Sequence, residues 1–290
     1  MSHPGHALFE LPATLAVALV GWVYLRGWRR IRLSVPNASS ERRLAAFMVG
    51  LSSVWIAIGS PLTAFHHELL TVHMVQHVLL MAVAPPLLLM GAPGRPLLYG
   101  LPSRPTRGAF RGVGRFSAVQ ALRRFLMHPV VCWFVPVAAL IGWHVPAVFE
   151  LAVHSRWWHD VQAATFLATG LMFWSPVVRW PARRGTAPRW LMPLYLFLAT
   201  LPCDALSAFL VFCDRVVYSS YGSGSRLFAI APLEDQELAG ALMWVAVSLI
   251  YVVPAIVITM QLLSPPRPYA RRVAHGLALR TQRVGQSQVG

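Results

Sequence analysis

The stretch that decides the fold is Leu69-Leu-Thr-Val-His73-Met-Val-Gln-His77-Val-Leu-Leu-Met-Ala-Val-Ala-Pro85-Pro86-Leu-Leu-Leu-Met90. It is almost entirely apolar and, as a helix, long enough to cross the hydrocarbon core of a bilayer, which needs about 20 residues. Two histidines lie inside it, and ionisable side chains within a membrane span are rare, costly and candidates for function. Because Pro85 and Pro86 lack backbone N–H donors, we expect them to break or kink the span.

The composition of the whole chain is that of an integral membrane protein. Its 290 residues are 56% hydrophobic and only 12% charged, whereas a soluble domain carries about 25% charged residues. The apolar stretches predict an all-α fold with seven transmembrane helices in one domain, residues 1–264. These spans are predicted at about 11–28, 43–60, 69–90, 129–149, 161–178, 190–212 and 238–262. The N-terminus has no basic segment, so we expect no cleaved signal peptide.

The arginines predict the orientation, because the chain has no lysine and a net charge of +15. Twenty-two of the 25 arginines fall on one side of the predicted spans, and the exceptions are Arg156, Arg215 and Arg226. The positive-inside rule then places the N-terminus outside and the C-terminus in the cytoplasm of a bacterial inner membrane. Arginines in short loops indicate topology and not a nucleic-acid interface. The basic loop 91–125 is expected to lie on anionic membrane lipid, and 265–290 to form a basic cytoplasmic tail.

Nine of the eleven histidines fall on the outer side of this predicted membrane. His73 and His77 are spaced i, i+4 and therefore share one helix face. Met74 lies within one turn of both. His66 and His67 precede the span in an outer loop, and His66 would join the same face if the helix began before it.

The next two spans add further histidines on the same side. His144 lies near the outer end of the fourth span, and His154 and His159 lie in the loop leading into the fifth. Imidazole with thioether or thiolate suits copper, whereas imidazole alone also suits zinc, iron or haem. The alternative is a hydrogen-bonded polar seam between helices.

The sixth and seventh spans carry other candidates. Cys203 and Cys213 would lie about 15 Å apart on a straight helix and so cannot form a disulfide there; they are expected to be small buried side chains. Asp204 should face the bundle interior, balancing a protonated histidine or pairing with Arg215. Gln236, Gly240 and Met243 share one helix face, and Met243 would offer a thioether to copper. The chain has no Walker loop, no GxSxG and no HExxH, so we expect no enzyme.

Four stretches form a recognisable pattern: His73–Pro93, Trp143-His144-Val-Pro146, Gly170-Leu-Met-Phe-Trp174, and Pro232-Leu-Glu-Asp-Gln236 with Gly240, Met243 and Trp244. The pattern resembles the CtaG family of bacterial cytochrome c oxidase assembly proteins and extends over about 45–262. The resemblance implies a polytopic membrane protein needed for maturation of haem–copper oxidase at the copper step. The family often has His-x-x-x-His entering span five, but here Gln162 precedes Ala163, which cannot ligate a metal.

The sequence therefore predicts an assembly factor that binds or positions Cu(I) in a polar pocket open to the outer face. Its expected partners are a cytochrome c oxidase subunit, a periplasmic copper chaperone and membrane lipid. The predicted metal ligands are His73, His77, His144 and His159, with His66, His67 and Met74 as donors at the mouth of the site. The predicted partners that orient the imidazoles are Gln76, Asp204 and Gln236, with Met243 nearby.

Three other functions are compatible with the same residues. A haem- or quinone-linked redox protein would use His73 or His77 facing His144 as axial ligands. A copper or small-solute transporter would need a pathway that continues inward. A histidine-metal hydrolase would need a carboxylate base, for which Glu68 and Glu150 are the candidates.

Overall fold

The computed structural model describes residues 4–34, 40–101, 116–179, 188, 190–222 and 229–264, and every regular element in these ranges is helical. Six helices are long and apolar enough to cross a membrane, and a bent pair of shorter helices raises the number to as many as seven. The all-α membrane class is thus confirmed, whereas the exact count of seven and the orientation stay predictions. The predicted tail 265–290 and the middle of the loop 91–125, residues 102–115, lie outside the described residues.

Most spans lie where the apolar stretches predict them. The helices that extend beyond a predicted span do so into polar sequence: α12 begins at Pro232, where a proline at the first turn and the acids Glu234 and Asp235 favour a helix start. The long helices are α1 (Pro4–Ser34), α2 (Glu41–Ile58), α10 (Arg156–Arg179), α11 (Leu191–Phe212) and α12 (Pro232–Leu263).

The third span is continuous over Leu70–Met90, but it is not a regular α-helix throughout. It consists of α3 (Leu70–Val78), a π-helical turn η3 (Leu79–Val83) and α4 (Ala84–Met90). In the π turn the Ala84 N–H donates to the Leu79 carbonyl, five residues earlier. Pro85 and Pro86 follow at the start of α4. The break or kink that we predicted there is therefore a π-helical turn within one continuous span.

The fourth predicted span, 129–149, is wrong at its outer end. Helix α8 (Pro129–His144) stops at His144, and a separate helix α9 (Pro146–His154) follows. Val145 between them is extended, with φ −62° and ψ 124°, because the ring of Pro146 disfavours the α conformation in the preceding residue.

A short amphipathic helix, α7 (Ser117–Leu126), precedes α8 and meets it at an angle of 68°. Leu122 and Phe125 are exposed on it, and Phe116 is exposed just before it, beside the basic Arg123 and Arg124. This composition is typical of a helix lying in a membrane interface, which agrees with the expectation for the second half of the loop 91–125.

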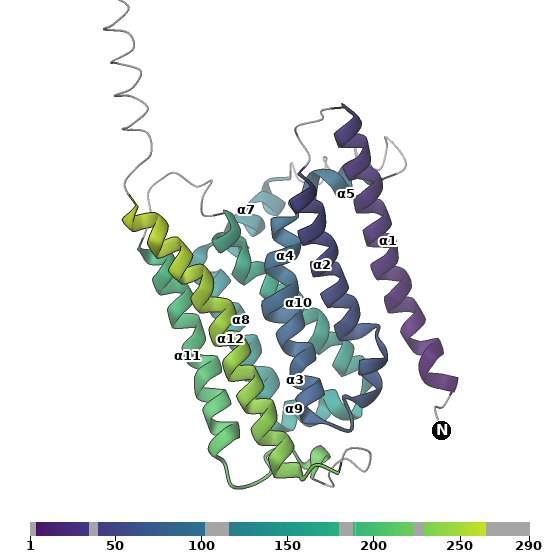
Figure 1. Ribbon diagram of the computed structural model, residues 1–290, viewed down its shortest axis with the longest axis vertical. Helices are drawn as coiled ribbons and strands as arrows, with labels where there is room; N and C mark the ends of the chain where they lie inside the picture. Colours follow the sequence, from purple (N-terminus) through teal and green to yellow (C-terminus); the bar gives the residue numbers. More distant parts are fainter. Residues whose placement is uncertain are drawn as a thin grey trace, which may run out of the picture.

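The helices form one bundle (Figure 1). Helices α11 and α12 pack side by side at one edge, while α1 lies at the other edge against α2 and α5 (Gly94–Gly100). A Cβ on Gly27 would lie 1.8 Å from the Pro96 carbonyl oxygen, so α1 and α5 can approach this closely only because that residue is glycine. The start of α3 and α9 lie at one end of the bundle, and α5 and α7 lie at the other.

Candidate functional site

Six imidazole rings from four segments of the chain lie next to one another at the end of the bundle that contains α9. We call them the histidine row. Consecutive ring centroids are 3.7 Å apart for His67 and His66, 4.5 Å for His66 and His159, 5.5 Å for His159 and His73, 4.4 Å for His73 and His77, and 5.6 Å for His77 and His144. The third, fourth and fifth predicted spans are therefore neighbours at this end.

Each ring reaches the row from a defined place in the fold. His73 and His77 lie one turn apart on α3, His144 is the last residue of α8, and His159 lies in the first turn of α10. His66 is not on the same helix as His73, because Leu69 between them is extended, with φ −132°. It follows the short helix η2 (Pro61–Phe65) and still lies with its ring centroid 6.1 Å from that of His73.

The inner part of the histidine row is buried and contains polar atoms without partners. His73 is 0% exposed and His77 6% exposed, and neither ring nitrogen of either residue has a hydrogen-bond partner. His144 uses Nδ1 on the Leu140 carbonyl, 2.7 Å away, which leaves its buried Nε2 without a partner. Gln76 and Gln162 are also buried with unpartnered amides. Such groups cost about 1–3 kcal/mol each when nothing binds them, so this region is suited to a polar guest.

Asp235, which the sequence reasoning did not select, fixes the start of α3. Its carboxylate accepts from the backbone N–H of Leu70 at 2.6 Å and of Thr71 at 3.1 Å, and from the Thr71 hydroxyl at 2.6 Å. The first N–H groups of a helix have no partner within the helix, and a negatively charged carboxylate there also interacts favourably with the positive end of the helix dipole. A residue of α12 thereby caps the helix that carries His73 and His77. In the sequence, Asp235 indicates only the start of the helix that contains it, α12. No sequence signal connects it to α3.

Aromatic side chains cover the histidine row. Phe149 of α9 lies 5.0 Å from His73 between ring centroids and stacks on Tyr218 at 3.9 Å. The Tyr218 hydroxyl donates to the His144 carbonyl, and the Tyr221 hydroxyl donates to the His66 carbonyl. Burial raises the pKa of both tyrosines above the ordinary value, so these hydroxyls stay protonated donors. The segment between α11 and α12 is thereby attached directly to two members of the row.

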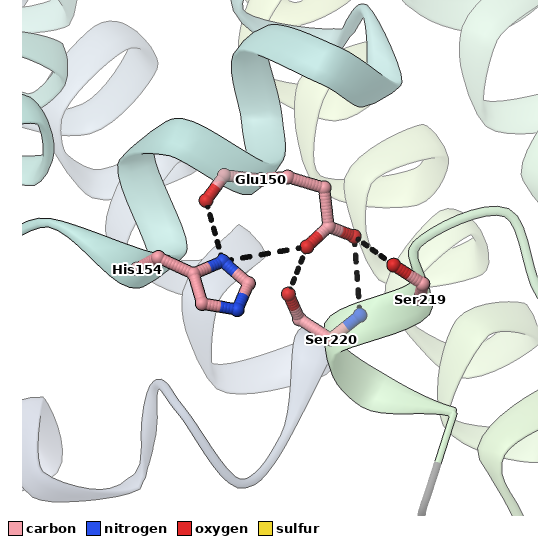
Figure 2. Close-up of polar contacts among 4 residues, drawn as sticks. All are labelled: Glu150, His154, Ser219 and Ser220. Atoms are coloured by element: carbon pink, nitrogen blue, oxygen red, sulfur yellow. Dashed lines mark hydrogen bonds and ion pairs between the residues drawn. The ribbon is translucent and has the colours of Figure 1, made fainter.

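Glu150 on α9 joins the same segment from the other side (Figure 2). Its carboxylate accepts from the Ser219 hydroxyl, the Ser220 backbone N–H and the Ser220 hydroxyl, and lies 3.5 Å from the His154 ring. Partial burial raises the pKa of Glu150, but these hydrogen bonds outweigh it and hold the pKa below the ordinary value of 4.5. We call this arrangement the Glu150 clasp. The carboxylate of Glu150, one candidate for the base of a histidine-metal hydrolase, is therefore already engaged in hydrogen bonds.

Two residues predicted to orient imidazoles have other partners. Asp204 accepts from Ser248 at 3.3 Å between α11 and α12, and the ion pair of Arg215 is with Asp214, so the predicted Asp204–Arg215 pair is wrong. Gln236 accepts from the Val217 N–H and donates to the Leu210 and Arg215 carbonyls. Asp204 thus joins two helices, and Gln236 holds the segment between them.

The two methionines differ in their surroundings. Met74 is fully buried in the apolar core with Leu70 and Val78, on α3. Met243 of α12 is also buried, but it lines a cavity that His77 lines as well.

The ring spacing bears on metal binding. An imidazole nitrogen lies about 2 Å from a first-row metal ion, so two rings on one ion have centroids about 5–6.5 Å apart. The pairs His77–His144, His73–His159 and His66–His73 have separations of 5.6, 5.5 and 6.1 Å. In the described part of the chain no three His, Cys, Asp or Glu side chains are arranged to hold a metal ion. The row therefore offers pairs of nitrogen donors.

Comparison with known proteins gives one family. A family model described as cytochrome c oxidase caa3 assembly factor (Caa3_CtaG) matches residues 22–264. Uncharacterized proteins of Mycobacterium bovis and Mycobacterium tuberculosis are each 25% identical over 87% of this chain, and one of Mycobacterium leprae is 25% identical over 95% of it. The chain spans only 38 to 40% of the length of these relatives. No solved structure matches it.

Proposed function

Because the chain belongs to the cytochrome c oxidase caa3 assembly factor family, we propose that it holds Cu(I) on the histidine row before the ion enters an oxidase subunit. Membership supports a role in oxidase assembly, and the several apolar helices support a place in a membrane. The copper cargo, the site and the direction of transfer are the parts that we propose.

The observation that carries the proposal is the set of buried ring nitrogens without partners on His73, His77 and His144. An apolar surrounding penalises such atoms, and a metal ion would bind them through neutral imidazole. Imidazole pairs suit Cu(I), which accepts two ligands and prefers softer donors than carboxylate. A pairwise site also suits a carrier, because an ion held by two donors can pass to a third donor without leaving its ligands.

The roles of the residues follow their order in the row. His67, exposed, and His66, half-buried, form the outer mouth. His159 links them to His73, and His77 and His144 form the innermost pair. Asp235 is a positioning residue that fixes the start of α3, and the Glu150 clasp holds the aromatic cover over the row.

We also propose seven spans, with the N-terminus and the histidine row outside and the C-terminus in the cytoplasm. The described arginines support this orientation, because the C-terminal part of α1 lies with α5 and α7 at the end of the bundle opposite α9. A fluorescent protein fused after Gly290 is expected to fluoresce, as it folds in the cytoplasm; a fusion that is silent there and active as a periplasmic reporter would reverse the orientation.

The haem and transport alternatives have weaker support. Two axial imidazoles need a free macrocycle plane between them, but Phe166 lies 4.5 Å from His77 and 6.4 Å from His144 between ring centroids. A transport pathway needs polar side chains further in, and α4, which continues the span inward, has only Ala, Pro, Leu and Met.

The test is metal and haem analysis of the detergent-purified full chain after loading with Cu(I). We expect bound copper that the double variant His73→Ala/His77→Ala loses, because the variant removes the centre of the row. His128→Ala is the matched control, since this exposed histidine lies at the start of α8 and outside the row. No copper in a folded wild-type protein would overturn the proposal and leave the row as a structural or docking seam. A Soret band in the wild type that the double variant loses would indicate that the histidine row binds haem and not copper.

A further inference from the structure

A cavity lies on the inner side of the histidine row, in the middle of the bundle. It has a volume of about 40 Å³ and is lined by side chains of α3, η3, α8, α10, α11 and α12. A water molecule needs roughly 10–15 Å³ of such space, so the cavity is large enough for a small ion. His77 lines it and is also a member of the row.

The donor atoms around this cavity are mainly sulfur. Cys203 of α11, Met243 of α12 and Met81 of η3 line it together with His77. Cys203 is 4% exposed and Met243 2% exposed, so both are held in the protein interior. A buried cysteine or methionine alone is ordinary core. Here His77, buried and without a hydrogen-bond partner on either nitrogen, lines the same cavity.

The π-helical turn contributes to the same wall. Met81 and Ala82 both lie in η3 and line the cavity. Pro85 and Pro86 have no N–H to donate to these two carbonyl groups, four residues earlier. Single π turns inside α-helices are frequent at functional sites. The wall beside His77 is therefore the irregular part of the span.

From this geometry we propose that the cavity is a second binding site, selective for a soft monovalent cation of the Cu(I) type, with Cys203, Met243 and His77 as donors. We call it the sulfur chamber. Thiolate and thioether ligands select Cu(I). Among its described lining residues there is no carboxylate, and Tyr251 supplies the one side-chain oxygen, so a hard divalent cation would find no charged ligand to compensate its charge.

His77 connects the sulfur chamber to the row. The ion would pass from the His73 side to His77 and exchange an imidazole for the Cys203 sulfur. The thiol would give its proton to the imidazole nitrogen that the ion leaves, and the oxidation state of the ion would not change. The sulfur chamber thus deepens the proposed function and rests on it, because the row supplies the ion.

The experiment is X-ray absorption at the copper edge on the Cu(I)-loaded full chain, with copper content measured on the same sample. We expect sulfur as well as nitrogen in the nearest shell of wild-type protein. The double variant Cys203→Ala/Met243→Leu should lose the sulfur and one copper ion per chain while keeping nitrogen-bound copper on the row. Cys132→Ala is the matched control, because this buried cysteine of α8 lies outside the cavity and donates to the Leu126 carbonyl.

The outcomes separate the two proposals. Copper with only nitrogen ligands in the wild type overturns the sulfur chamber and leaves the row in place, and this result needs no variant to fold. Sulfur that persists in the double variant, or that Cys132→Ala removes, also overturns it. A wild-type protein that binds no copper overturns the sulfur chamber and the proposed function together.

Discussion

Replacing Asp235 is expected to destabilise the protein more than any other single carboxylate of the described chain, although its partners lie on a different helix. Asp235→Ala removes two charge-assisted hydrogen bonds to the backbone of Leu70 and Thr71 and one to the Thr71 hydroxyl. Hydrogen bonds to a charged group contribute about 1.5–3 kcal/mol each, and loss of a helix cap costs about 0.5–2 kcal/mol. Because Asp235 is 4% exposed, water replaces these bonds poorly. The three bonds share one carboxylate at one helix start, so their contributions do not add, and we expect a loss of about 2–4 kcal/mol in the free energy of unfolding.

The assay is unfolding of the purified protein in mixed micelles, followed by tryptophan fluorescence. Asp235→Asn should lose about half as much as Asp235→Ala, since one acceptor oxygen remains. Asp214→Ala is the control, because the Asp214 side chain is 95% exposed and makes only a 4.0 Å ion pair with Arg215; it should change the free energy by less than about 0.5 kcal/mol. Equal stability of the Asp235→Ala and Asp214→Ala variants would refute the idea that Asp235 holds α3.

Two further predictions concern packing and pH. Gly170→Ala should cost about 1–3 kcal/mol of unfolding free energy, because its Cβ would lie 2.7 Å from the Met81 carbonyl oxygen and from Pro85. In the same unfolding assay Gly142→Ala, which meets nothing within 4 Å, should be neutral or slightly stabilising; matching losses would contradict this reading. The Glu150 clasp should stabilise the protein fully above the ordinary carboxyl pKa of 4.5 and lose this effect as the pH falls through its lowered pKa. The thermal midpoints of wild type and Glu150→Gln should therefore converge on acidification, and a constant gap would count against the clasp.

The sequence predicted the membrane class and the shared helix face of His73 and His77, for a physical reason. Apolar length defines a span regardless of its neighbours, and the i, i+4 spacing of His73 and His77 gives them one face in any helix. The helix ends were harder. The end of α8 at His144 depends on a local effect of Pro146 that a count of apolar residues passes over.

Long-range polar contacts could not be predicted. Asp204 and Gln236 looked like partners for imidazole because buried polar residues need partners, but their hydrogen bonds go to Ser248 and to backbone groups of the 210–217 segment. Asp235 was missed because its partners are 164 and 165 positions away. Periodicity gives the face of a helix, but it does not give the element that packs on that face.

The π-helical turn η3 also changes the phase of the span. One extra residue in a turn rotates everything beyond it by about 100° relative to an unbroken α-helix. The outer half, α3, packs on α12, whereas the inner half, α4, packs on α2 and α10. Removing one residue from 79–83 would restore regular winding and turn the faces of α3 and α4 out of register with these neighbours. A single inserted residue thus lets one membrane span pack its outer half on α12 and its inner half on α2 and α10.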